Sequence, residues 1–210
     1  MHKISLPQFA IDRGRMMHPP KPLVPAQTAV LAIDFQRFFI DDGQPMGNPH
    51  ARDMLDAANR IHAAVRNAGG LVIFTQHSVG APGQSASAEA VVSLTLLPGS
   101  SAYDLHPRIV RTKDDVLVVK HQSSPLHPKS NTKLVELLHK RGITTLIVTG
   151  LVTNGCCDCT ARDAFQHGFD VVVASDGTAA MTDEEHNAAL LNLEIYYARV
   201  MTTTEIEAAL

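Results

Sequence analysis

Three absences in the sequence narrow the classes of protein to which it can belong. No stretch approaches the ~20 apolar residues that a membrane span requires, and the opening MHKISLPQFAIDRGRMMHPPKP lacks the continuous apolar core of a signal peptide. The net charge is −3 with no block of Lys or Arg, which argues against nucleic acid or an anionic membrane as a partner. All three cysteines fall within residues 156–159, so no disulfide ties distant segments together. We therefore expect a cytoplasmic protein with reduced thiols.

What the sequence does contain fits one folded domain. Its 210 residues are enough for one domain of typical size, roughly 100 to 200 residues, and too few for two. Residues 1–27 are rich in proline and methionine, and we expect them to form an extended arm on the surface or on a neighbouring subunit. Residues 28–210 are expected to form the single domain.

Short β-branched runs alternate with helical patterns from residue 28 onward. Six runs have the composition of strands: TAVLAID (28–34), GLVIFTQ (70–76), DVLVVKH (115–121), ITTLIVTG (143–150), FDVVVAS (169–175) and VMTTTEI (200–206). The alternation predicts an α/β fold with a doubly wound, mostly parallel six-stranded sheet and helices on both faces. Residues 77–114, rich in Ser, Ala, Gly and Pro, interrupt the pattern, and such an insertion commonly carries function or a partner contact.

Three reactive residues stand at the ends of predicted strands. Asp34 ends the first strand, Lys120 lies at the end of the third, and Cys156 follows the fourth. Because the carboxyl ends of parallel strands meet at one edge of a sheet, we expect the three side chains to share a cleft. A carboxylate near a thiol can take its proton and return it to a leaving amine, and an ammonium keeps that carboxylate ionised.

The cysteine cluster allows a metal site, a redox pair or a single nucleophile. Zinc requires ligands that converge from separate segments, which one short helix does not supply. A disulfide between Cys156 and Cys159, three residues apart, stays open. As a nucleophile at a helix start, Cys156 would have its thiol pKa depressed towards neutrality. Cys157 and Cys159 are expected in the helix body as small apolar residues.

The stretches LAIDFQRFF, VVKHQSSPLHP and GLVTNGCCDCTARDAF resemble the isochorismatase-like cysteine hydrolase family, over residues 28–205. That family includes nicotinamidases, carbamoylsarcosine and biuret amidases, and isochorismatases, on a Rossmann-like three-layer fold. The resemblance implies a catalytic triad of Asp34, Lys120 and Cys156. It also implies a cis peptide bond between Leu151 and Val152, with an oxyanion hole formed by the N–H groups of Val152 and Cys156. Homo-oligomers, dimers or tetramers, are expected by the same resemblance.

Nicotinamidases of this family bind a metal through an Asp and two His after the second strand. The sequence FTQHSVGAPGQSASA places His77 near the first ligand position, but no second His follows, so we expect no metal and no cofactor, and nicotinamide is a less favoured substrate. Residues that flank the triad in sequence are the candidates for substrate contact: Phe35, Phe39, His77, Gln122 and Ser124.

These features favour hydrolysis of the C–N bond of a small carboxamide or ureido compound, through a thioester on Cys156 and with release of ammonia. Two alternatives stay open. The first is isochorismatase-type hydrolysis of a vinyl ether, with Asp34 as the acid, although the presence of Cys156 and of HQSSP after Lys120 favours amide chemistry. The second is a binding subunit of the family without catalytic activity.

Overall fold

A computed structural model describes residues 1–79 and 96–210, which form a three-layer α/β structure. Six parallel strands make one sheet in the order β3-β2-β1-β4-β5-β6. Their bounds are β1 Thr28–Ile33, β2 Leu71–His77, β3 Val116–Lys120, β4 Thr145–Leu151, β5 Asp170–Ala179 and β6 Arg199–Met201. The direction of winding reverses between β1 and β4, and ligands of open α/β sheets bind at this switch point. The predicted fold class is confirmed.

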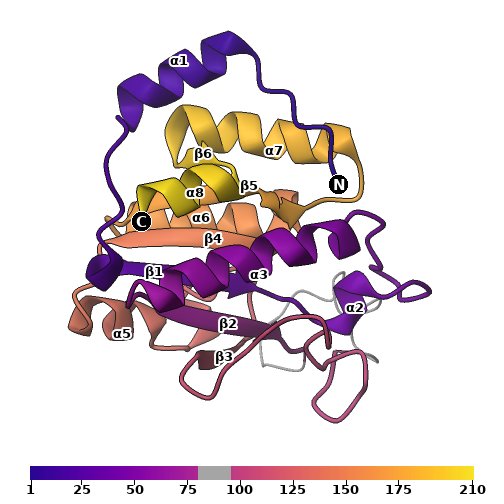
Figure 1. The fold of residues 1–210 in the computed structure, drawn as a ribbon. Coiled ribbons are helices and arrows are strands. Elements are labelled where there is room, and N and C mark those ends of the chain that lie inside the picture. Colours follow the sequence, from indigo (N-terminus) through magenta and orange to yellow (C-terminus); the bar gives the residue numbers. More distant parts are fainter. Residues whose placement is uncertain (80–95) are drawn as a thin grey trace.

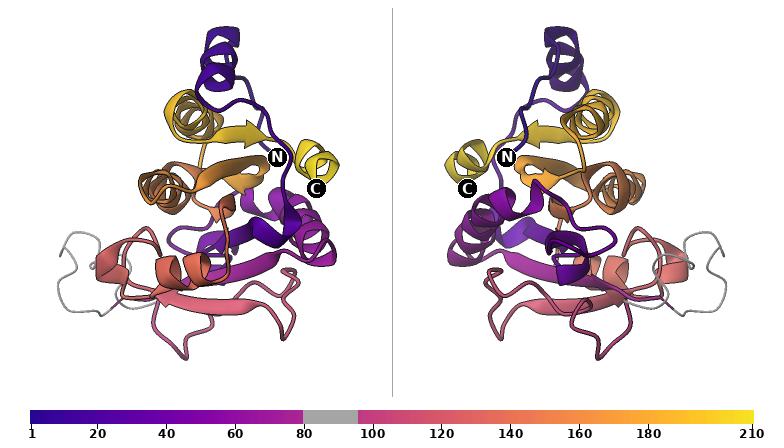
Figure 2. Two further views of the ribbon diagram at one scale, coloured as in Figure 1. Left: turned by 90° about the vertical axis from the view of Figure 1, so that its left-hand side faces the viewer. Right: turned by 90° about the vertical axis from the view of Figure 1, so that its right-hand side faces the viewer.

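Helices cover both faces of the sheet (Figure 1, Figure 2). On one face lie α3 (Ala51–Asn67) and α8 (Thr203–Ala209), and on the other lie α5 (Leu134–Lys140), α6 (Asp158–Gln166) and α7 (Asp183–Tyr196). The short α2 (Arg37–Ile40) follows β1. Single helical turns are η1 (Pro25–Gln27), η2 (Pro128–Ser130) and η3 (Thr153–Cys157).

The central strand β1 explains how the layers are held together. All six of its residues are buried. Because side chains alternate along a strand, Leu31 and Ile33 pack under α5, α6 and α7, while Val30 packs under α3 and α8. The residue after β1, Asp34, is fully buried as well.

Two segments differ from the sequence prediction. The arm is not extended throughout, because Gln8–Met17 forms helix α1, which packs against α7 of the same chain (Figure 1). The prolines that suggested an extended arm all follow this helix. The sixth strand ends at Met201 instead of running to residue 206. Thr202 and Glu205 form a capping box that starts α8, and this local signal overrides the β propensity of the threonines.

The insertion after β2 includes residues 80–95, which lie outside the described residues. Its function as predicted from composition is therefore not addressed by the structure. Among the described residues, no helix has both the length and the apolar character needed to cross a membrane.

Candidate active site

Four neighbouring strands deliver polar side chains to one edge of the sheet. Asp34 follows β1, His77 and Lys120 are the last residues of β2 and β3, and Cys156 lies in the turn after β4. One carboxylate oxygen of Asp34, one ring nitrogen of His77 and Sγ of Cys156 lie within 4.8 Å of one another. The predicted convergence of the three reactive residues is therefore present in the structure.

The centre of the site is the Lys120 ammonium. Its Nζ lies 2.7 Å from Asp34 Oδ2 and 3.4 Å from Cys156 Sγ, and the Asp34 and Lys120 side chains are both fully buried. It also donates to the carbonyls of Gln122 (3.1 Å) and Ser123 (2.9 Å). Burial lowers the pKa of Lys120, but the charge of Asp34 and the Cys156 sulfur outweigh it, and the net shift is upward. Lys120 is thus a permanent cation in the site.

Thr75 on β2 fixes the Asp34 carboxylate. Its hydroxyl donates to Asp34 Oδ1 at 2.6 Å and accepts from the Asp34 N–H at 3.1 Å. Asp34 has φ of 51°, a left-handed conformation that is uncommon for residues other than glycine. The strained backbone and the two hydrogen bonds turn the carboxylate towards the cleft. Thr75 is not among the residues predicted from the sequence; the available signal was a polar residue directly after the apolar run LVIF.

The turn that carries Cys156 is brought close to β1 by a glycine. Gly150 has φ of 113°, and a Cβ there would lie 2.0 Å from the Ile33 carbonyl oxygen, so no other residue fits between the two strands. The Leu151–Val152 peptide bond is cis. The Val152 carbonyl then accepts the N–H groups of Gly155 (3.0 Å) and Cys157 (3.2 Å), which closes the turn over its own backbone.

The protonation state of Cys156 differs from the sequence expectation. Burial raises the pKa of the Cys156 thiol to about 12, the negative charge of Asp34 acts in the same direction, and the Lys120 ammonium only partly opposes them. This direction is opposite to the depression expected from a helix start, because burial of the sulfur disfavours the thiolate. The resting site therefore holds a thiol beside a carboxylate.

Comparisons with known proteins place the chain in a family. A family model described as the isochorismatase domain matches residues 28–205. Nicotinamidase 3 of Arabidopsis thaliana is 31% identical, with 87% of this chain and 88% of that protein covered. Maleamate amidohydrolase of Pseudomonas putida is 27% identical, with coverage of 83% and 82%. A crystal structure of a cysteine hydrolase from Pseudomonas syringae matches with a TM-score of 0.80 at 26% identity, covering 91% of this chain and 97% of that chain.

The chain belongs to the isochorismatase family. It is therefore a hydrolase, and the resemblance inferred from the three sequence motifs is confirmed. The family match begins at residue 28, so it does not include residues 1–27, which contain helix α1.

The other two cysteines of this family member have different surroundings. Cys157 is fully buried, as expected for a small apolar residue, whereas Cys159 is exposed on α6, contrary to expectation. All three cysteines are free thiols, so Cys156 and Cys159 are not paired in this structure.

The nicotinamidase-type metal does not fit the residues around Cys156. Asp34, His77 and Cys156 are close enough to share an ion, but the Lys120 ammonium is within hydrogen-bond distance of all three, 3.2 Å from His77 Nδ1. A metal cation would have to displace this buried ammonium. Burial and the charge of Lys120 lower the pKa of His77 to about 4, so His77 is a neutral acceptor for the ammonium.

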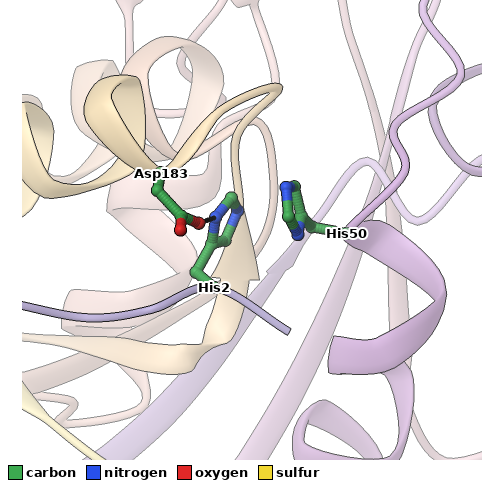
Figure 3. Close-up of side chains that lie close together, drawn as sticks. All are labelled: His2, His50 and Asp183. Carbon is green, nitrogen blue, oxygen red and sulfur yellow. Dashed lines mark hydrogen bonds and ion pairs between the residues drawn. The ribbon is translucent and has the colours of Figure 1, made fainter.

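A second group, His2, His50 and Asp183, also lies within reach of one ion (Figure 3). His2 Nε2 accepts the N–H of Ala180 at 3.0 Å, so its proton is on Nδ1, which donates to Asp183 Oδ1 at 2.7 Å. A metal on Nδ1 would move the proton to Nε2, where it would face the Ala180 N–H. The group therefore suits hydrogen bonding within the protein better than a metal.

The predicted substrate contacts divide into two sets. Phe35 is fully buried and Phe39 nearly so, and both pack in the core beside α3, which gives Phe35 no surface for a ligand. Ser124 is also buried: its hydroxyl accepts the Leu126 N–H and stabilises a turn. His77 and Gln122 are half-buried and contact Lys120 directly.

A large cavity formed by the described residues is remote from Cys156. It has a volume of about 740 Å³ and lies between the N-terminal segment and the edge of the sheet at β6. Ile11, Arg15, Glu194 and Met201 are among the residues that line it, and Asp34, Lys120 and Cys156 are not. We assign the chemistry to the strand-end site, because only reacting groups held in contact can transfer protons.

Proposed function

We propose that the chain hydrolyses the C–N bond of a small carboxamide or ureido compound through a thioester on Cys156. The supporting observation is the position of Lys120 Nζ, 2.7 Å from Asp34 Oδ2 and 3.4 Å from Cys156 Sγ, with the Asp34 and Lys120 side chains fully buried. This arrangement brings a base, a cation and a nucleophile together. The similarity to a maleamate amidohydrolase and a nicotinamidase supports an amide as the substrate.

The first half of the reaction forms the thioester. The Cys156 thiol passes its proton to Asp34 as the sulfur attacks the carbonyl carbon, so a C–S bond forms and the carbonyl π electrons move to oxygen. The N–H groups of Val152 and Cys156 hold this oxyanion, and each such donor contributes about 3 kcal/mol to lowering the barrier. The C–N bond then breaks, Asp34 returns the proton to nitrogen, and ammonia leaves.

The second half releases the acid. A water molecule gives a proton to Asp34 and attacks the thioester carbon, and the C–S bond breaks as the sulfur regains that proton. Lys120 remains protonated throughout. Its charge stabilises the carboxylate before each proton transfer and the developing thiolate during it.

A screen of small amides and ureido compounds for ammonia release tests the proposal, with wild type and Cys156→Ala measured in parallel. We expect turnover by the wild type and none above background by the variant. Turnover of a vinyl ether that survives Cys156→Ala would instead favour isochorismatase chemistry with Asp34 as the acid. Failure of the wild type on both substrate classes would favour the binding subunit.

A further inference from the structure

Three histidine rings meet where the N-terminal segment crosses the starts of α3 and α7. The ring centroid of His2 lies 3.9 Å from that of His50 and 4.1 Å from that of His186, and the second pair is nearly parallel at 10°. Figure 3 shows the His2 ring beside His50, with Asp183 at its edge. Only 3% of the His2 side chain is exposed. The start of the chain is thus inserted into the fold.

The backbone next to His2 is also held by α7. The N–H of Lys3 donates to Asp183 Oδ1 at 3.3 Å, and the N–H of Ser5 donates to Asn187 Oδ1 at 2.7 Å. The Asn187 side chain donates in return to the Lys3 carbonyl at 3.0 Å. These bonds keep the His2 ring against His186.

His186 connects the ring stack to the turn that carries Cys156. Its Nε2 lies 3.0 Å from the Ser175 carbonyl, which can only accept, so the proton is on Nε2 and Nδ1 is an acceptor. The Thr153 hydroxyl donates to that Nδ1 at 2.8 Å. Both side chains are fully buried. Thr153 directly follows Val152 and is the first residue of η3, which contains Cys156.

The turn needs support from outside itself. Gly155 has φ of −130° and ψ of −106°, so the helical backbone is interrupted one residue before Cys156. The backbone hydrogen bonds from the N–H groups of Gly155 and Cys157 both end on the Val152 carbonyl, and neither orients the Thr153 side chain. The Thr153–His186 bond provides this support from α7.

We propose that His186, covered by His2, is a positioning residue that sets the orientation of the Val152–Cys156 turn. This inference rests on the proposed function, because that turn carries the nucleophile and the proposed oxyanion donors. Burial and the adjacent His2 lower the pKa of His186 to about 4, so the ring is neutral and remains an acceptor for Thr153. The His2 ring excludes water that would compete for the Thr153 hydroxyl.

A matched pair of substitutions isolates the hydrogen bond. In His186→Asn the side-chain oxygen takes the place of Nδ1 and still accepts from Thr153, whereas in His186→Gln the side-chain nitrogen takes the place of Nε2 and the acceptor is lost. We expect His186→Gln to lower kcat for ammonia release about 10-fold with KM changed less than 2-fold, and His186→Asn to stay within 3-fold of wild type. Thr153→Val should reproduce the loss, and Thr153→Ser should restore kcat.

Two variants test the contribution of His2. His2→Ala is expected to lower kcat about 3-fold, while the control Gln8→Ala, which removes an exposed hydrogen bond to Asp12 within helix α1, leaves kcat unchanged. Hydrogen exchange of the amides of residues 152–156, followed by mass spectrometry, gives a readout that needs no substrate. These amides should exchange about 10-fold faster in His186→Gln than in wild type or His186→Asn.

The outcomes separate this inference from the proposed function. If no amide is turned over but exchange differs between the two His186 variants, the positioning role holds and the proposed reaction fails. If exchange and kcat are the same in His186→Gln and His186→Asn, the histidine serves stability alone and the inference is overturned.

Discussion

Removing the buried ion pair one partner at a time separates its cost in stability from its role in catalysis. Asp34 and Lys120 are 2.7 Å apart with no exposed side-chain surface. Lys120→Met leaves a carboxylate buried without its counter-ion, and Asp34→Asn leaves a buried ammonium, so each change should cost about 3 to 5 kcal/mol of unfolding free energy. Typical domains have only about 5 to 15 kcal/mol in total. Each single variant should therefore lose a large part of its unfolding free energy.

The double variant Asp34→Asn, Lys120→Met should recover most of that loss. No unpaired charge remains, and replacing a buried pair with neutral groups is often neutral in stability. The carbonyls of Gln122 and Ser123 still lose their donor, at about 1 kcal/mol each, so we expect the double variant within about 2 kcal/mol of wild type. All three variants should release no ammonia.

Urea unfolding of the four proteins at pH 7.5, together with an ammonia-release assay, measures both effects. The reasoning is refuted if Lys120→Met lowers the unfolding free energy by less than about 1 kcal/mol, because an unpaired buried charge destabilises the fold by more than that. It is refuted equally if the losses of the single variants simply add in the double variant, which would mean that the two charges do not interact.

Three further predictions concern Thr75, Cys156 and His62. Thr75→Val removes both hydrogen bonds to Asp34 and should lower kcat by about 10- to 100-fold, which corresponds to the loss of one hydrogen bond to a charged group. The control Thr75→Ser should stay near wild type. Equal kcat values for the two variants in an ammonia-release assay would contradict this prediction. The rate at which iodoacetamide alkylates Cys156 should rise about 10-fold per pH unit from pH 6 to 9, because the thiol pKa is raised to about 12. The rate is measured from the amount of modified peptide. A plateau below pH 8 would indicate a preformed thiolate. Burial lowers the pKa of His62 to about 3, so below pH 6.5 the unfolded chain binds a proton that the folded chain does not. The unfolding free energy, measured in urea, should therefore fall by about 2 kcal/mol between pH 7 and pH 5 because of His62. This loss should be absent in His62→Gln.

The sheet was predictable because each strand carries its own signal. A run such as ITTLIVTG is β-branched and apolar throughout, which fits a strand buried on both faces. Helix α1 was not predictable in the same way. Its stability depends on packing Ala10 and Gly14 against α7, a contact between segments far apart in sequence. The prolines therefore predicted the extended conformation correctly only for the part of the arm that follows helix α1, from residue 18 onward.

The convergence of Asp34, Lys120 and Cys156 followed from their places at strand ends, but the electrostatics of the group did not. Sequence indicates that Cys156 stands near a helix start, which alone would favour a thiolate. It does not indicate how much water surrounds the sulfur, and that quantity decides the sign of the pKa shift. Thr75 was missed for a related reason: a threonine in a strand usually serves β propensity, and only the fold shows that it lies beside Asp34.

The raised pKa of Cys156 and the buried ion pair have one cause, and together they define how the site works. Exclusion of water strengthens the attraction between Lys120 and Asp34 and also keeps the neighbouring thiol protonated. A thiolate stored in the resting site would be open to oxidation, whereas a thiol is much less reactive. In the proposed reaction, Cys156 becomes a nucleophile only as its proton moves to Asp34 and a substrate carbonyl receives the electron pair. On this proposal, the burial that strengthens the Asp34–Lys120 ion pair also keeps the Cys156 thiol protonated until a substrate carbonyl is present.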